Sequence, residues 1–376
     1  MTDVVVMSLE RWDDVWRRNQ HLIAGLLRRD PRLRVLFVEP AVDPLHDLVQ
    51  RQRPRWPRGL RPGPALPSGP TKRLWLLESA KWLPRRLAPG VDARLAGEVV
   101  AATGRLGFEA PTLWVNDPDG AAVLEVTGWP ALYDITDDWL LADRPPVETE
   151  RRARAEELLM ERAREVVVCS PTLACTKSKR RDVVLVPNAV DVAAYQRRQP
   201  RPSDLPAEPY ALYVGTVHRD RMDVSLCLDT ARALRGRGRL VVVGPLALSP
   251  RDRAQLERSG VVLLGPRPAE QVPAYLQHAE VLVVPHVVTP FTDSLDPIKR
   301  YEYLAVGRPV VSTPVAGFRD AADHMITVVG ASAFASAVAE RVPDRSPRPV
   351  LPVSGVPSWR DRVAQFAEVL DRVRAP

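Results

Sequence analysis

The chain contains 376 residues, of which 45% are hydrophobic and 26% charged, a composition that excludes a disordered chain and predicts two domains of ordinary length. No apolar run approaches the roughly 20 residues of a membrane-spanning helix, and the first residues lack the basic and long apolar segments of a secretion signal, so we expect a cytoplasmic protein. The formal net charge is +7, but only five of the 53 basic residues are lysines; this bias towards arginine, without any recognition module, disfavours nucleic acid as a partner.

Short apolar runs alternate with amphipathic stretches through the first half of the chain, which is typical of strand–helix–strand units that build a parallel sheet. Helices are expected at 15–29 and 148–164. The expected strands lie at 4–8, 34–39, 112–116, 131–135, 165–169 and 183–187. We therefore expect an N-terminal Rossmann-like domain over residues 1–190.

Residues 49–90 interrupt this alternation with arginines, prolines and three tryptophans. One interpretation is a basic, aromatic surface loop that contacts anionic lipid or a lipid-linked acceptor. The other is an insertion with ordinary packing. Peripheral contact with the inner face of the membrane is the most that this segment predicts.

The strand–helix pattern restarts near Tyr210, so a second Rossmann-like domain is expected over residues 209–357. Its expected strands lie at 210–215, 239–244, 260–265, 280–285 and 308–313. Residues 191–208 are rich in proline and charge and show no sustained periodicity, as a linker does. The fold class is therefore α/β, with two Rossmann-like domains that face each other across a cleft. An amphipathic helix over 358–376 is expected to pack back on the N-terminal domain.

The segment LDPIKRYEYLAVGRPVVSTPVAG (295–317) predicts a helix over 296–305. Asp296 suits its N-cap, Pro297 its first turn and Gly307 its end. The free N–H groups at the start of such a helix bind phosphate oxygens.

Lys299 and Glu302 lie three residues apart, on one face of this helix. A lysine can neutralise a diphosphate, and a carboxylate can accept hydrogen bonds from the hydroxyls of a ribose. An exposed ion pair between the two side chains is the alternative.

Several motifs share a resemblance. KRYEYLAVGRPVVSTPVAG resembles the donor-binding signature of GT-B glycosyltransferases, particularly those similar to glycosyltransferase family 4. VPNAVD (186–191) resembles the turn between their domains, and YVGTVHRDRMD (213–223) resembles their glycine-containing loop near the donor diphosphate. SLERWDDVWRRNQHL, LWVNDPDG and YDITDDW narrow the resemblance to the teichuronic-acid-type bacterial glycosyltransferases. It covers nearly the whole chain.

This resemblance implies a donor site in the C-terminal domain and an acceptor site in the N-terminal domain, with no metal or other cofactor. The expected donor-binding residues are Gly215, Thr216, His218, Arg219, Asp296, Ile298, Lys299 and Glu302. The expected acceptor-binding residues are Trp12, Asn116, Asp117, Asp137 and Asp138. The expected catalytic residues are Asp137, Asp138, Lys299 and Arg219, because carboxylates can take a proton from the acceptor and cations can stabilise the leaving diphosphate. An aspartate pair that caps the next helix is the alternative for Asp137 and Asp138.

The resemblance implies a glycosyltransferase that moves a sugar from a nucleoside diphosphate sugar to an acceptor hydroxyl, in bacterial glycan or secondary-metabolite biosynthesis. Two departures bear on this. Ser294 stands where family 4 has the first of two acidic residues, of which only Glu302 is present, and the usual histidine of the N-terminal domain is replaced by Thr136 or Asp137. Retention at the sugar is expected, although an aspartate at the acceptor also suits inversion. A sugar-nucleotide epimerase of the same fold and a catalytically silent partner of another transferase are the alternatives.

Overall fold

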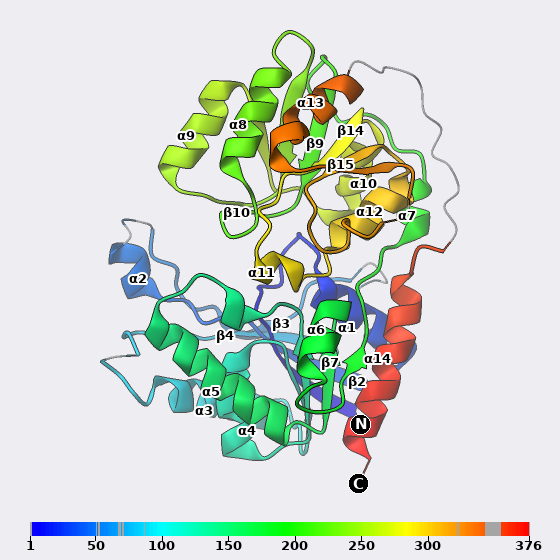
Figure 1. Ribbon diagram of the computed structural model, residues 1–376. Helices are drawn as coiled ribbons and strands as arrows, with labels where there is room; N and C mark the ends of the chain where they lie inside the picture. The colour runs from blue at the N-terminus through cyan, green and yellow to red at the C-terminus, as the bar shows by residue number, and fades with distance from the viewer. Residues whose placement is uncertain are drawn as a thin grey trace.

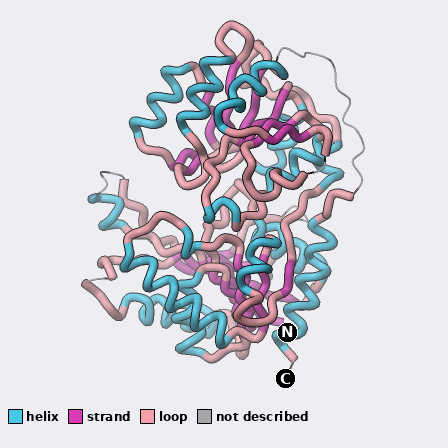
Figure 2. The backbone as a smooth tube through the Cα atoms, viewed as in Figure 1, coloured by secondary structure: helices cyan, strands magenta, loops and turns pink. Residues whose placement is uncertain are grey.

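The computed structural model describes residues 2–49, 51, 53–66, 69, 71–85, 87–321, 323–342 and 355–375. The chain folds into two α/β domains, one in the lower and one in the upper half of Figure 1. The strands, magenta in Figure 2, lie at the centre of each domain and helices surround them. This arrangement confirms the α/β class and the two Rossmann-like units predicted from the alternating pattern.

The N-terminal domain is built on an eight-stranded sheet in the order β3-β4-β2-β1-β5-β6-β7-β8. Val4 and Val6 of β1 face one hydrophobic core and Val5 faces another, because successive side chains of a strand point to opposite faces of the sheet. The strands are β1 (Thr2–Met7), β2 (Leu33–Val38), β3 (Gly59–Pro62), β4 (Leu74–Glu78), β5 (Thr112–Val115), β6 (Ala131–Ile135), β7 (Glu165–Val168) and β8 (Val184–Leu185).

Helices cover both faces of this sheet. On one face, α1 and α14 cross so closely that a Cβ atom added to Gly25 would lie 2.3 Å from Cγ2 of Val363. The helices of this domain are α1 (Arg18–Arg29), α2 (Pro44–Val49), α3 (Val91–Arg105), α4 (Ala121–Thr127), α5 (Pro146–Arg162), α6 (Pro171–Lys177) and α14 (Trp359–Arg374), with 3-10 turns η1 (Pro118–Gly120) and η2 (Trp139–Leu141).

The segment 49–90 differs from the surface loop that its composition predicts. Leu74–Glu78 forms β4, a buried strand that pairs in parallel with β2, and Gly59–Pro62 forms the antiparallel edge strand β3. Arginine and proline dominate the composition of the segment and conceal the apolar run LWLL at its centre. The loop interpretation is therefore wrong for these two strands.

The C-terminal domain has a six-stranded parallel sheet in the order β13-β11-β9-β14-β15-β16. Its strands are β9 (Tyr210–Val214), β11 (Arg239–Val243), β13 (Val262–Gly265), β14 (Val281–Val284), β15 (Val310–Ser312) and β16 (Ile326–Val328), beside the small pair β10 (Val217–His218) and β12 (Leu246–Ala247). Its helices are α8 (Val224–Ala233), α9 (Pro250–Ser259), α10 (Val272–Gln277), α11 (Pro290–Asp293), α12 (Ile298–Val306) and α13 (Ala331–Arg341), with the 3-10 turn η3 (Ala269–Gln271).

The chain passes between the domains twice. It leaves the N-terminal domain after β8 and returns between α13 and α14, the red helix beside the lower domain in Figure 1. The two crossings meet, because the backbone N–H of Val190 donates to the carbonyl of Pro357 (3.1 Å) and Val190 pairs with Ser358 in an isolated bridge. The two covalent connections between the domains thus lie side by side.

Residues 191–208, predicted as a linker, lie against the C-terminal domain. They include α7 (Val192–Gln196), which packs on α12. Beyond α7, the backbone N–H of Gln199 donates to the side chain of Gln277 (2.9 Å), and Leu205 is buried in the core of the C-terminal domain. No helix within the described ranges is long and apolar enough to cross a membrane.

Candidate active site

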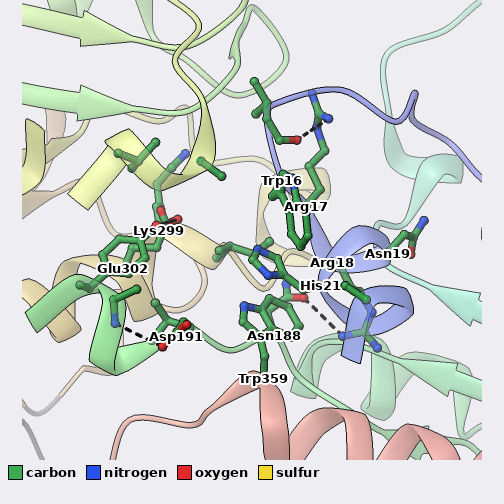
Figure 3. A pocket seen from close by; sticks show the side chains of 18 of the residues that line it. Trp16, Arg17, Arg18, Asn19, His21, Asn188, Asp191, Lys299, Glu302 and Trp359 are labelled. Carbon is green, nitrogen blue, oxygen red and sulfur yellow. Dashed lines mark hydrogen bonds between the residues drawn. The ribbon is translucent and has the colours of Figure 1, made fainter. Parts of the chain in front are cut away.

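A cleft of about 1490 Å³ is lined by residues of both domains. In Figure 3, Trp16, Arg17 and Arg18 at the start of α1 stand opposite Lys299 and Glu302 of α12. The predicted site residues that line the cleft are Gly215, Thr216, Asp296, Ile298, Lys299 and Glu302 from the donor set, and Asn116 and Asp137 from the acceptor set. The predicted residues outside its lining are Trp12, Asp117, Asp138, His218 and Arg219.

The helix predicted from the 295–317 motif is present as α12, and it begins two residues later than expected. Its N-cap is Pro297, with no side-chain cap, whereas Gly307 ends it in the left-handed conformation as predicted. Asp296 is not the cap, because its carboxylate accepts hydrogen bonds from the backbone of Asn188 (2.6 Å) and from the Tyr301 hydroxyl (2.8 Å). Asn188 is distant from Asp296 in sequence, so no local pattern predicts that it binds the Asp296 carboxylate in place of the helix N-terminus.

Lys299 projects from the first turn of α12 towards two polar groups of the C-terminal sheet. Its Nζ donates to the Tyr213 hydroxyl at 2.9 Å and lies 3.3 Å from Nε2 of His286. Burial, together with the nearby charge of Arg221, lowers the pKa of Lys299 to about 7, and Glu302 opposes this shift. Burial and the two cations also hold the pKa of His286 well below its usual range, so that His286 is neutral.

Gly215 makes room for this lysine at the end of β9. Its φ of +141° is a conformation that residues with a side chain rarely adopt, and a Cβ atom there would lie 3.1 Å from Nζ of Lys299. A side chain at position 215 would therefore strain the backbone and crowd Lys299, which explains the glycine of the motif. Gly244 supports it from the next strand, because a Cβ atom on Gly244 would lie 2.1 Å from the carbonyl oxygen of Gly215.

Glu302 faces the cleft one turn further along α12. Its Oε1 accepts a hydrogen bond from the Tyr195 hydroxyl of α7 at 2.5 Å. Burial raises the pKa of Glu302, and the hydrogen bond from Tyr195 and the charge of Lys299 limit the increase. The two residues are therefore not an exposed ion pair, since each makes its own contacts in the cleft wall.

Arg221 is the cation that the glycine-containing loop brings into the cleft, and the sequence analysis missed it. The side chain of Arg219 is 73% exposed and lies near Asp252 instead. A turn in which the N–H groups of Arg221 and Met222 donate to the carbonyl of His218 reverses the chain, and Arg221 points back to the cleft. The motif supplied the right loop, but the direction of its side chains depends on this turn.

Two carboxylates lie on the N-terminal side of the cleft. Asp137 follows β6, and its Oδ1 accepts from Arg221 of the other domain at 3.3 Å. Glu10, which was not among the predicted site residues, follows β1, lines the same cleft and pairs with Arg17 at 3.5 Å. Burial, together with the charge of Asp137, raises the pKa of Glu10 to about 7 against the opposing effects of Arg17 and Arg221. Burial likewise raises the pKa of Asp137.

Asn116, Asp117 and Asp138 belong to the framework around this side of the cleft. Asn116 accepts from Asn19 (2.9 Å) and donates to the carbonyl of Asp134 (3.0 Å). Asp117 caps η1. Asp138 lies 3.3 Å from the ammonium of buried Lys177. These contacts account for the three side chains within their own domain.

Trp12 packs edge-on against Phe37 in the hydrophobic core, with ring centroids 5.1 Å apart. Two other tryptophans, Trp16 and Trp359, line the cleft, and Trp16 meets His21 edge-on at 5.1 Å. His21 in turn stacks on Trp359 of α14 at 4.6 Å, with the planes 8° apart. This aromatic wall joins residues that are far apart in sequence.

A buried polar chain connects the two domains beneath the cleft. Arg18 contacts the carboxylate of Asp134 (3.2 Å) and donates to the side chain of Asn188 (3.3 Å). Asn188 then donates to Asp296 from its backbone N–H and from its side chain. The start of α12 is thus linked to the N-terminal sheet.

Ser294, the departure from the family 4 pattern, lies in a second contact between the domains. Its hydroxyl accepts from the backbone N–H of Asp138 (3.1 Å), and its carbonyl accepts from Ser170 (2.6 Å). It is buried and does not line the cleft. The serine therefore serves domain contact at a position where the family pattern has a carboxylate.

Comparison with known proteins agrees with this architecture. Sucrose-phosphate synthase from Thermosynechococcus elongatus is similar in structure, with a TM-score of 0.66 and 18% identity over 99% of each chain. Anabaena HepE in complex with UDP is also similar, with a TM-score of 0.58 and 14% identity over 99% of this chain and 100% of that one. The fold is that of the GT-B glycosyltransferases.

Residues 208–344, which form most of the C-terminal domain, match the family described as Glycosyl transferases group 1. This match covers about a third of the chain. A protein of Bacillus subtilis (strain 168), named as a teichuronic acid biosynthesis glycosyltransferase, TuaH, is 24% identical over 219 residues. The match spans 54% of this chain and about half (55%) of that relative.

Proposed function

We propose that this protein is a glycosyltransferase that moves a sugar from a nucleoside diphosphate sugar to an acceptor hydroxyl. The observation that carries the proposal is the placement of two cations opposite two carboxylates in the cleft. Lys299 and Arg221 lie on the C-terminal side beside the start of α12, and Glu10 and Asp137 lie on the N-terminal side, where Asp137 contacts Arg221. A reaction in which a diphosphate leaves and a hydroxyl loses its proton needs both kinds of group close together.

The donor diphosphate is assigned to the free N–H groups at the start of α12 and to Lys299 and Arg221. Glu302 is positioned to accept hydrogen bonds from the ribose hydroxyls. A bound diphosphate would place negative charge beside Lys299 and raise its pKa from about 7, so that the lysine binds the diphosphate as a cation. The UDP bound to HepE, a protein of the same fold, supports a nucleotide in this domain arrangement.

The acceptor is assigned to the N-terminal side of the cleft. Glu10 and Asp137 are the groups placed to receive the proton of its hydroxyl, and the aromatic wall formed by Trp16, His21 and Trp359 is available for an acceptor ring. Asp138 and Arg219 are left out of this mechanism because neither lines the cleft. Metal independence and retention at the sugar stay predictions. The anomeric configuration of the product, measured by NMR, distinguishes retention from inversion.

A thermal-shift screen with UDP, GDP, dTDP, ADP and CDP tests the donor site, because a ligand that binds only the folded state raises the melting temperature. We expect one nucleotide to give a selective increase, which Lys299→Ala and Glu302→Gln reduce. A folded protein that responds to none of the five contradicts the donor assignment.

Product analysis with the matching nucleotide sugar then separates transfer from its alternatives. Transfer requires an acceptor for sugar consumption beyond slow hydrolysis. Sugar isomerisation without acceptor identifies an epimerase. Selective binding without turnover, across a panel of acceptors, identifies a silent partner, the alternative favoured by Ser294. Lys299→Ala should lower turnover at least about tenfold, and an unchanged rate would remove it from the mechanism.

A further inference from the structure

The net positive charge of this chain is concentrated in one segment. Residues 43–87 contain ten basic and three acidic residues, so their formal charge of +7 equals that of the whole chain. The remaining sequence is balanced. A general bias towards arginine does not explain this distribution, because the bias acts on the whole chain while the excess lies in one place.

The same segment also carries most of the exposed apolar surface. Of the twelve large apolar side chains that are exposed in the described part of the chain, seven lie between residues 45 and 87. These seven residues, which we call the apolar patch, are Leu45, Leu48, Val49, Trp56, Trp82, Leu83 and Leu87. Val49 is 70% exposed and Trp56 is 65% exposed, although both would be stabilised by removal from water.

Three contacts hold the parts of the patch together. Trp56 and Trp82 meet with ring centroids 5.9 Å apart. An ion pair between Arg55 and Asp47 (2.8 Å) fixes the 53–58 stretch against α2. A second ion pair, between Lys81 and Asp43 (2.9 Å), fixes the Trp82 segment beside the start of α2. Segments that are about 40 residues apart therefore form one surface, on the side of the N-terminal domain opposite α14 in Figure 1.

The acidic residues of the segment are all neutralised within the protein. Asp43 and Asp47 pair as described, and Glu78 contacts Arg58 at 3.0 Å. By contrast, Arg51 and Arg53, between α2 and Trp56, are exposed and have no carboxylate partner among the residues that the structure describes. The surface therefore offers apolar and aromatic side chains beside cations that are free to bind anions.

We propose that the apolar patch and the adjacent arginines are a docking surface for an anionic lipid bilayer. Tryptophan favours the boundary between acyl chains and headgroups, leucine and valine enter the acyl region, and arginine is attracted to anionic headgroups. A second copy of this chain would bring the same excess of positive charge to the contact and is disfavoured by repulsion. Docking in this way would bring the domain to which we assign the acceptor to the membrane. The proposal goes beyond sugar transfer and does not depend on it.

Vesicle co-sedimentation of the protein tests this, with phosphatidylcholine alone and with about one-third phosphatidylglycerol. We expect binding to the anionic vesicles and little to the neutral ones. The double variants Trp56→Ala/Trp82→Ala and Arg51→Glu/Arg53→Glu should each weaken binding to anionic vesicles at least about tenfold. These side chains are exposed, so thermal melting should remain close to that of the parent protein.

Matched controls use exposed residues elsewhere. Val126→Ala/Val288→Ala removes apolar side chains, and Arg235→Glu/Arg258→Glu reverses two charges in the C-terminal domain. Controls that bind like the parent support the proposal, whereas controls that lose as much binding as the patch variants overturn it. Absence of binding to anionic vesicles also overturns it. Light scattering that detects a dimer, lost in Trp56→Ala/Trp82→Ala, would assign the surface to a second copy instead.

Discussion

The surroundings of Lys299 favour a bound anion, because none of the described residues brings a carboxylate into contact with its ammonium group. Its ammonium contacts two neutral groups, the hydroxyl of Tyr213 and the ring of His286, while the carboxylate of Glu302 is held by Tyr195. The nearby charge of Arg221 adds repulsion. A negatively charged ligand would stabilise the charged lysine. The site therefore lowers the stability of the ligand-free protein and favours binding of an anion.

This environment predicts a pH-dependent difference in stability between the parent protein and Lys299→Met. The pKa of Lys299 is about 7 in the folded protein, below its ordinary value of 10.5, so burying the charged lysine lowers the free energy of unfolding by its full amount below pH 7. Between pH 7 and pH 10.5 the unfolded state binds more protons than the folded state, so this loss of stability becomes smaller as pH rises. Lys299→Met should therefore melt at a higher temperature than the parent at pH 6, and the gap should shrink by pH 9.

Calorimetry without nucleotide measures this difference. Lys177→Met is the contrasting variant, because Lys177 is buried in ion pairs with Glu156 and Asp138 and its loss should lower the melting temperature. A constant gap between parent and Lys299→Met from pH 6 to pH 9 would contradict the assigned pKa.

Glu10 predicts a pH dependence of activity. Its pKa of about 7 lies above the ordinary value of 4.5 because of burial and Asp137, so the carboxylate that can accept a proton forms only as pH rises through about 7. We expect kcat/KM to increase over this range, and Glu10→Gln to lower it and to remove the increase. Asp143→Asn, exposed in the same domain and outside the cleft lining, should retain it. If kcat/KM of Glu10→Gln still increases through pH 7, the increase belongs to another titrating group.

At the scale of elements, each strand that the local pattern predicts is present, whereas β3, β4, β10, β12 and β16 were not predicted. Each buried run such as TLWV or YALYV is short, apolar and bounded by polar residues, and the observed strands fall within a few residues of those predicted. The site was less predictable because tertiary contacts direct its side chains. Asp296 turns to Asn188, and Arg221 enters the cleft only through a turn. Glu10 lies in the SLERWDDVWRRNQHL motif, which does not single it out from Asp13 and Asp14.

The crossing of α1 and α14 predicts a stability effect at Gly25. A methyl group there would meet Val363 at 2.3 Å, and overpacking of this kind typically costs about 1–3 kcal/mol. Gly25→Ala should therefore lower the midpoint of denaturant unfolding. Val363→Ala in the same molecule should recover part of the loss, because it removes the methyl groups that clash. If the two effects simply add, the helices do not meet as described.

At the scale of the whole molecule, the domains are connected by polar contacts at the base of the cleft and by a small apolar cluster in which Trp139 packs on Phe291. Arg18, Asn188 and Asp296 form one polar contact, and Ser294 with Asp138 forms another. Interdomain contacts of this mixed kind are compatible with opening and closing around a ligand. The aromatic wall built from α1 and α14 adds residues of the chain's final helix to the same cleft.

Asn188→Ala should loosen this connection. It removes the side-chain bonds to Arg18 and Asp296 and leaves the guanidinium buried with Asp134 alone. We expect weaker nucleotide binding, by about three- to tenfold, and a larger radius of gyration in X-ray scattering. Gln255→Ala, in α9 and outside the cleft lining, should leave both quantities unchanged. Unchanged scattering and binding in Asn188→Ala would show that this contact does not hold the domains.

The return of the chain to its first domain also orders events during synthesis. Phe366 of α14 is fully buried against Trp114 of β5, with ring centroids 4.4 Å apart, so the N-terminal core stays open until α14 has left the ribosome. Residues 209–342, which need no later segment for their own core, can fold first. The N-terminal domain is therefore translated first but completed second. Its apolar surface would stay uncovered until α14 is available.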